Sequence, residues 1–199
     1  MISKTVSRCA LGFEALEDKV LLAGDVAVGI VDGDLFVNGD ELSNHVSIVA
    51  DSESQQFVIR GLPDADGVDT TLNGQNAPIR IDGIGGDVRV RMGRGADTVD
   101  VPRGSFQSLG IDMGRGDDHV RLGGPGGGDT GDEPSSEGSV SDARLDVAGN
   151  LRVTLGGGND GLRANSVDVG RQAAVSGGRG ADRIGLSDVM ARQARVRTG

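Results

Sequence analysis

Apolar residues alternate with polar residues or glycine along much of the chain from residue 25 onward. A spacing of two residues is typical of β-strands that turn one face inward and the other to solvent. Residues 26–30 and 35–37 form two such runs, joined by Asp32-Gly33, and Asn38-Gly39 follows the second run. Asp-Gly and Asn-Gly between alternating runs are strong signals for β-hairpins. We therefore predict strands joined by tight turns in this part of the chain, with further strands at 46–48 and 57–60.

The alternation becomes regular from Ile79, where strands lead into and out of a short glycine phrase. The phrase G-x-G-x-D occurs four times, starting at Gly93, Gly114, Gly156 and Gly178, so the first glycines lie 21, 42 and 22 residues apart. A fixed period of this size predicts stacked structural units. We therefore expect an all-β fold, a parallel β-helix or β-solenoid with coils of about 21 residues.

Three parts follow from this pattern. Residues 1–24 form a leader-like segment, residues 25–78 a β-hairpin region with a degenerate capping coil, and residues 79–199 the solenoid repeats. The capping coil is predicted because residues 44–48 echo residues 97–101. A flexible, acidic, Gly-rich insertion at 123–142 accounts for the doubled interval between the second and third glycine phrases.

The last residues keep the register of the repeat. Ala194, Val196 and Gly199 fall at the positions that Val88, Val90 and Gly93 occupy in an earlier coil. The sequence thus reaches the start of a fifth glycine turn, as expected if the repeat array were cut short or ended without a cap. An exposed last coil of this kind favours edge-to-edge self-association.

Composition agrees with stacked coils. The 199 residues include 35 Gly and 4 Phe but neither Tyr nor Trp, so aromatic bulk does not fill the core. Residues 25–142 carry 22 acidic and 8 basic residues, and residues 143–199 carry 5 acidic and 9 basic residues. The acidic part argues against nucleic acid as a partner and is compatible with cations. The sequence contains no apolar run long enough to span a bilayer.

The glycine phrase also offers oxygen ligands. Alternating glycines permit left-handed backbone conformations and a sharp turn whose carbonyl oxygens face inward, and the following aspartate adds a carboxylate. Calcium takes about 6–8 oxygens, more than one turn supplies. Two turns on neighbouring coils, about 4.8 Å apart, are able to share one ion.

The phrase resembles the RTX (haemolysin-type) calcium-binding nonapeptide, G-G-x-G-x-D-x-U-x, in which U is a large apolar residue. Residues 177–185 match every fixed position, and the other three phrases match from the second glycine onward. The resemblance implies a β-roll-like fold and calcium as cofactor. The ligands it implies, with the neighbouring Asp117 and Asn159 as further oxygen donors, are Gly93, Gly95, Asp97, Gly114, Gly116, Asp117, Asp118, Gly156, Gly158, Asn159, Asp160, Gly178, Gly180 and Asp182.

Two features depart from that family pattern. The phrase occurs once per coil rather than in tandem, so at most one edge of each coil carries metal. Arg94, Arg115 and Arg179 occupy the third position of the nonapeptide, where a cation disfavours calcium. The alternative is that the phrase only makes a tight, soluble corner, with each aspartate bonding its own backbone. If calcium binds, the turns at 93–97 and 114–118 form the best pair.

The N-terminal segment resembles the LEPR-XLL leader of large, repeat-rich bacterial surface or exported proteins. Leu16-Glu17 and Leu21-Leu22 match that motif, whereas Asp18-Lys19 departs from its Pro-Arg. The resemblance implies that the protein is secreted or held at the cell surface.

Enzyme signatures are weak. His45 and His119, the two histidines, are expected to be exposed coil-edge residues, and Cys9 has no neighbouring base. We therefore expect a non-catalytic, exported or surface protein with a structural or adhesion role, whose partners are calcium and extracellular matrix, glycan or other surface proteins. The alternative is a β-helix that binds or cleaves polysaccharide with outward-facing Arg89, Arg91, Asp112 and Arg152, although such sites usually also need aromatic platforms.

Overall fold

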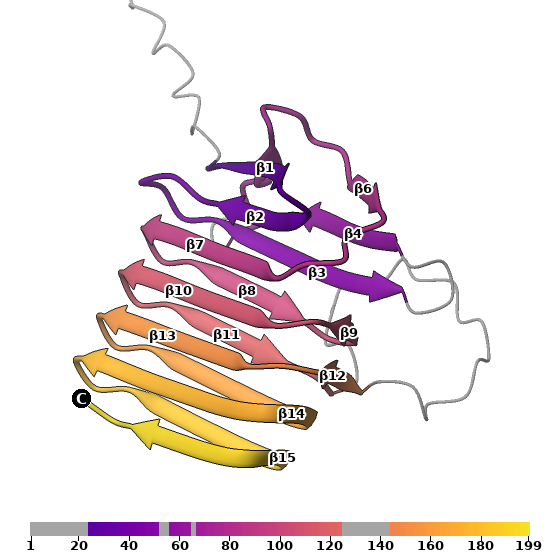
Figure 1. Ribbon diagram of the computed structural model, residues 1–199. Coiled ribbons are helices and arrows are strands. Elements are labelled where there is room, and N and C mark those ends of the chain that lie inside the picture. Colours follow the sequence, from indigo (N-terminus) through magenta and orange to yellow (C-terminus); the bar gives the residue numbers. More distant parts are fainter. Residues whose placement is uncertain (1–23, 52–55, 65–66, 125–143) are drawn as a thin grey trace, which may run out of the picture.

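The structure is a computed structural model that describes residues 24–51, 56–64, 67–124 and 144–199 (Figure 1). It is all-β, as predicted, with 68% strand. The strands are β1 (Asp25–Val31), β2 (Asp34–Asn38), β3 (His45–Asp51), β4 (Gln56–Gly61), β5 (Thr71–Leu72), β6 (Ile79–Asp82), β7 (Val88–Arg94), β8 (Thr98–Val101), β9 (Gly104–Phe106), β10 (Leu109–Arg115), β11 (His119–Leu122), β12 (Leu145–Val147), β13 (Leu151–Gly157), β14 (Gly161–Arg179) and β15 (Arg183–Arg197).

The described strands join into one almost closed sheet of mixed strand orientation. Three ladders of parallel strands run through it. The first, β2-β7-β10-β13, ends on the last third of β14. The second, β3-β8-β11, ends on the first residues of β14, and the third, β9-β12, ends on its middle. Because β15 pairs with β14 along nearly its whole length, it continues all three ladders (Figure 1).

The register of the first ladder explains the doubled interval in the sequence. Leu109 pairs with Val88, 21 residues earlier, and also with Leu151, 42 residues later. The longer interval therefore adds no strand to this ladder. The extra residues fall between β11 and β12, where the predicted insertion at 123–142 lies. Of that insertion only Gly123 and Gly124 belong to the described residues, and residues 1–23 of the leader-like segment also lie outside them.

Antiparallel strands are added at the N-terminal end of the stack. β1 and β2 form a hairpin in which Asp32 and Gly33, with φ of 53° and 85°, make the two-residue turn. Two positive φ values are those of a type I′ turn, so this predicted hairpin is confirmed. β4 pairs antiparallel with both β3 and β6.

The hairpin predicted at Asn38-Gly39 is wrong. β2 pairs with β1 and β7 but not with β3. The N–H of Gly39 donates to the carbonyl oxygen of Arg91 at 2.7 Å, which continues the parallel ladder instead of closing a hairpin. The chain then crosses to β3 through residues 39–44, and His45 pairs with Thr98. The register thus matches residues 44–48 with residues 97–101, as the echo between them predicts.

The inward positions of the three ladders form one continuous apolar core. Val, Leu, Ile and Met predominate there, and Met92, Met113 and Leu155 are fully buried just before their glycine turns. The rings of Phe57 and Phe106 meet edge to face at 5.5 Å near the β9 side. Small, branched side chains therefore fill the interior, as the composition predicts.

β15 lies at the C-terminal end of this stack. Among the described strands it pairs only with β14, and Leu186, Met190 and Val196 on it are 44%, 49% and 47% exposed. Ala194 and Val196 pair with Ala173 and Val175, which confirms the register predicted for the last residues. None of the described residues forms a helix of the length and apolarity that a membrane crossing needs.

Successive glycine turns stack so closely that no side chain fits at the two glycines of the G-x-G-x-D phrase. A Cβ atom on Gly114 would overlap the carbonyl oxygen of Gly93, and one on Gly116 would overlap that of Gly95. The same contact recurs at Gly156, Gly158, Gly178, Gly180 and Gly199. Gly114 and Gly116 also have φ of 96° and 136°, which disfavour any L side chain. Backbone contact between turns thus sets the glycine positions of the phrase.

Two neighbouring glycines in one turn test this requirement. Gly158 has φ of 147° and packs on the carbonyl oxygen of Gly116, whereas a Cβ on Gly157 would meet nothing within 4 Å. We predict that Gly158→Ala lowers the free energy of unfolding by about 3 kcal/mol or more, because strain and overlap add. Gly157→Ala should change it by about 0.5 kcal/mol or less.

Urea unfolding of the two variants, followed by circular dichroism, measures both effects. Equal losses in the two variants would contradict a specific role for the stacked contact.

Candidate functional site

A column of aspartates runs along the glycine turns. Asp97, Asp118 and Asp160 each follow a turn and precede a strand of the second ladder, and they are 0%, 0% and 2% exposed. Asp182 occupies the same position in the next turn and is half-buried. Asn44 holds this position in the turn between β2 and β3, and it is also buried. The structure therefore brings four of the predicted metal ligands into one column.

Each aspartate bonds the backbone of the preceding coil. Asp97 Oδ1 accepts the N–H of Asn44 at 2.8 Å, and Asp118 Oδ1 accepts the N–H of Asp97 at 2.9 Å. The pattern continues with Asp160 Oδ1 on the N–H of Asp118 at 2.9 Å, and with Asp182 Oδ1 on the N–H of Asp160 at 3.2 Å. The alternative to metal binding had each aspartate bond its own backbone, whereas the structure shows a ladder of bonds between coils. The backbone N–H at each turn exit is thus bonded by the carboxylate of the next coil.

The second carboxylate oxygen has no such partner. Oδ2 of Asp97, Asp118, Asp160 and Asp182 is buried and forms no hydrogen bond with the described residues. A buried carboxylate oxygen without a donor is costly when the group is charged. A proton or a cation at these oxygens removes that cost.

Burial changes the acidity of the column. Burial raises the pKa of Asp97 to about 7, although the N–H bond from Asn44 opposes the rise and the charge of Asp118 adds to it. Burial likewise raises the pKa of Asp118 to about 6, opposed by the N–H bond from Asp97 and assisted by the charge of Asp160. The pKa of Asp160 is raised for the same first reason. Near neutral pH Asp97 and Asp118 therefore lie close to their protonation midpoints.

Asp117 and Asn159 belong to a second, outer ladder. Asp117 Oδ1 accepts the N–H of Asn159 at 2.7 Å, and Asn159 Oδ1 accepts the N–H of Ala181 at 3.1 Å. Ser43 Oγ accepts the N–H of Ala96 at 3.0 Å in the same way. Here the side chain of one coil accepts from the following coil, opposite to the aspartate column. Two ladders of opposite direction therefore hold the turns together.

The predicted carbonyl ligands lie in a different environment. The carbonyl oxygens of Gly93, Gly95, Gly114, Gly116, Gly156, Gly158 and Gly178 each face the glycine Cα of the next turn. No cluster of three or more His, Cys, Asp or Glu side chains with metal-binding geometry occurs in the described part of the chain. The column's unpartnered side-chain oxygens are thus the Asp Oδ2 atoms, and each of these glycine carbonyls lies against the glycine of the next turn.

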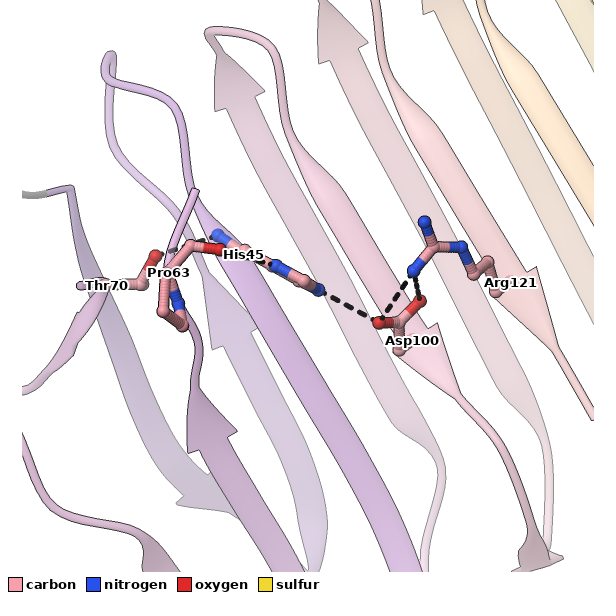
Figure 2. Close-up of polar contacts among 5 residues, drawn as sticks. All are labelled: His45, Pro63, Thr70, Asp100 and Arg121. Carbon is pink, nitrogen blue, oxygen red and sulfur yellow. Dashed lines mark hydrogen bonds and ion pairs between the residues drawn. The ribbon is translucent and has the colours of Figure 1, made fainter. Parts of the chain in front are cut away.

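A separate polar cluster surrounds His45 (Figure 2). Its Nε2 lies 2.9 Å from Asp100 Oδ2, and its Nδ1 lies 2.8 Å from the carbonyl oxygen of Pro63. Asp100 also pairs with Arg121 at 3.4 Å on the next strand, and the backbone N–H of His45 donates to Thr70 Oγ1 at 2.8 Å. Both ring nitrogens thus face oxygen atoms, one of a side chain and one of the backbone, which fixes the orientation of the ring.

This arrangement corrects the expectation for one histidine. The His45 side chain is 20% exposed and ties β3 to β8 and to the residues around Pro63, so it is not a free coil-edge residue. His119 is exposed, as expected. The sequence contained one signal for the cluster: once residues 44–48 are aligned with 97–101, His45 and Asp100 fall on adjacent strands, two residues apart in register.

Comparison of the chain with protein-family models, with curated proteins and with solved structures finds no match in any of the three.

The raised pKa values predict a dependence of stability on pH. An acid whose folded pKa exceeds its unfolded value of 3.8 holds its proton more tightly when folded, so stability is lost as pH rises from about 4 to about 7. Since one pKa unit corresponds to about 1.4 kcal/mol, we expect Asp97 and Asp118 together to lower the free energy of unfolding by about 2 kcal/mol between pH 5.5 and 7.5.

Asp97→Asn should reduce that loss and stabilise the protein at pH 7.5, because the amide resembles the protonated acid and its Oδ1 still accepts from Asn44. Asp112→Asn, at an exposed position of β10, is the matched control and should leave the pH dependence unchanged. Urea unfolding at the two pH values measures both. A steeper loss in Asp97→Asn than in the parent would contradict the buried-acid assignment.

Proposed function

We propose that this chain is a non-catalytic structural repeat protein, a β-solenoid that serves as a scaffold or adhesion module outside the cell or on its surface. The observation that carries the proposal is the repetition of one contact set at every glycine turn. Successive turns share the glycine contact and the aspartate hydrogen bond, over offsets of 21, 42 and 22 residues. A fold built of identical neighbour contacts is approximately additive in stability and stiff along its axis.

Burial and pairing of the polar groups support a structural role. The aspartates that mark the phrase lie beneath the surface and bond backbone N–H groups of the neighbouring coil. The most enclosed histidine is used in an ion pair and a backbone contact that join three segments. Aspartate and histidine, which are common in catalytic sites, thus form contacts that hold neighbouring segments together in this fold.

Calcium is the cofactor that this proposal includes. The unpartnered Oδ2 atoms of Asp97, Asp118, Asp160 and Asp182 are hard oxygen donors of the kind that Ca²⁺ takes. Equivalent atoms of neighbouring strands repeat at about 4.8 Å, close to twice a calcium–oxygen distance of about 2.4 Å. Bound calcium would supply positive charge to the buried carboxylates, and the aspartates would hold it while their Oδ1 atoms keep the backbone bonds.

The proposed location rests on the leader-like segment and on the acidic surface. The N-terminal residues resemble an export-associated leader, and residues 25–142 carry an excess of acidic side chains. If calcium binds, a chain with a cation-dependent column is looser where calcium is scarce and ordered where it is abundant, because binding free energy adds to folding free energy.

The alternative function is a β-helix that binds or cleaves polysaccharide. Arg89, Arg91, Asp112 and Arg152 lie on outward positions of the first ladder and are exposed. Of these, Arg89 is engaged, because it lies 3.0 Å from Asp34 and covers the ring of Phe36 at 5.4 Å. The remaining outward arginines favour binding of a ligand over its cleavage, since glycoside hydrolysis usually requires two facing carboxyl groups.

The calcium component predicts a shift in thermal stability. At pH 7.5, saturating CaCl₂ should raise the melting temperature by about 5–10 °C relative to chelator, which corresponds to about 2.7 kcal/mol at a hundredfold excess over Kd. MgCl₂ at the same concentration should give a smaller rise, because it demands a tighter octahedral set of ligands. Differential scanning calorimetry measures both shifts.

Asp118→Asn is the variant that tests the site, and Asp112→Asn is its control. The first should remove most of the calcium shift while the second keeps it. An unchanged melting temperature in calcium would remove calcium from the proposal and leave the scaffold, whereas recovery of the protein in the cytosolic fraction of its native cells would contradict the surface location.

A further inference from the structure

An open groove lies on the outer face of the sheet where β13, β14 and β15 run side by side. Its volume is about 320 Å³. Short side chains form the floor, namely Thr154, Ala174 and Ser176, while longer ones rise around it, namely Arg152, Arg195 and Arg197. The groove is thus a shallow channel between arginines.

The strand register places these residues in two rows across the strands. Arg152, Ala174 and Arg195 are direct partners in one row, and Thr154, Ser176 and Arg197 are partners in the next. In each row a small residue on β14 therefore lies between a residue on β13 and a residue on β15. This alternation of small and long side chains makes the groove.

Three arginines line the groove although the chain carries a net charge of −10, and the neighbouring Asp112, the partner of Thr154 on β10, is not part of the lining. No carboxylate lines it, and none of its three arginines forms an ion pair with the described residues. Other arginines are neutralised: Arg89 pairs with Asp34, and Arg121 pairs with Asp100. Guanidinium groups that are close together and unpaired repel one another and bind anions, with two parallel hydrogen bonds to each carboxylate or sulfate.

The spacing of the arginines sets the size of the anion. Arg152 and Arg195 lie two strands apart, which is about 10 Å, and Arg195 and Arg197 lie two residues apart on one strand, which is about 7 Å. A single small anion does not reach all three. A linear ligand with several anionic groups, spaced by about 7–10 Å, contacts them together while it lies over the short residues of the floor.

Two further features distinguish between linear polyanions. The hydroxyl groups of Thr154 and Ser176 and the amide of Gln172 line the groove and match the hydroxyl groups of a sugar. No aromatic side chain lines it, so neither base stacking nor an aromatic platform for a sugar ring contributes, and recognition rests on the arginines and the polar side chains. The hydroxyl and amide groups favour a glycan over a nucleic acid.

We propose that this groove is a binding site for an acidic polysaccharide, one that carries carboxylate or sulfate groups along its chain. The proposal names a ligand class for the surface role proposed above. It rests on that role only for the location in which the protein meets the ligand. The groove lies on the outer face of the sheet and none of the buried aspartates lines it, so the two sites share no residue.

Isothermal titration of the full chain at low ionic strength tests the proposal with four probes. The acidic probes are a sulfated heparin hexasaccharide and a carboxylated oligogalacturonate, and the controls are a neutral dextran oligosaccharide and an oligo-dT of similar charge. We expect at least one acidic glycan to bind, and comparison of the two acidic probes shows whether sulfate or carboxylate is preferred. We expect no binding of dextran and weaker binding of oligo-dT.

The double variant Arg195→Gln/Arg197→Gln should weaken glycan binding at least tenfold and reduce the slope of log K against log salt concentration by about two. Arg163→Gln/Arg171→Gln removes the same charge from exposed positions of β14 outside the groove and should change affinity less than twofold. Both variants should keep the circular dichroism spectrum and the calcium response of the parent.

Three results would overturn the proposal. They are absence of binding for both acidic glycans at millimolar concentration, equal losses of affinity in the two double variants, and tighter binding of oligo-dT than of either glycan. A failure here leaves the calcium-dependent melting unaffected, so the two proposals fail separately.

Discussion

The structure depends on the close vertical approach of successive glycine turns. At each level a carbonyl oxygen of one turn occupies the space that a side chain of the next turn would need, and the glycines adopt φ values between 96° and 147°. Backbone-to-backbone contact of this kind fixes the spacing between successive turns. Strands of the first and second ladders enter or leave these turns and share their 21-residue offset, as between β7 and β10 and between β8 and β11.

The aspartate column converts this geometric constraint into hydrogen bonds. A tight turn leaves an N–H at its exit that no strand partner satisfies, and a carboxylate from the following coil accepts it. The solution has a cost, because the same carboxylate brings a second oxygen beneath the surface. Burial then raises the pKa of Asp97 and Asp118 towards neutrality. The column therefore links the stability of the stack to protons and, under the proposed function, to calcium.

The outer faces of the sheet are free of these constraints and differ from one another. Near β2 and β7, arginine is paired with aspartate and covers an aromatic ring. On β13 to β15, arginines stand unpaired around short side chains and leave a groove. The inward positions thus carry the core that the strands share, while the outward positions differ along the sheet.

The sequence by itself determined the strands, the all-β class and the register of the repeat. Apolar alternation and the Asp32-Gly33 turn are local signals, because each reflects a physical requirement within a few residues. The 21-residue period is a signal of longer range that repeats these local patterns. The match of residues 44–48 with 97–101 was also readable, because the same inward positions recur. Tertiary structure alone decided which groups meet across coils. Asn38-Gly39 resembles a hairpin turn locally but continues a parallel ladder to β7, the aspartates bond the preceding coil instead of themselves, and His45 meets Asp100 and Pro63. Each of these contacts joins residues at least 18 positions apart, so the stacking of coils, which short-range patterns do not encode, selects the partner.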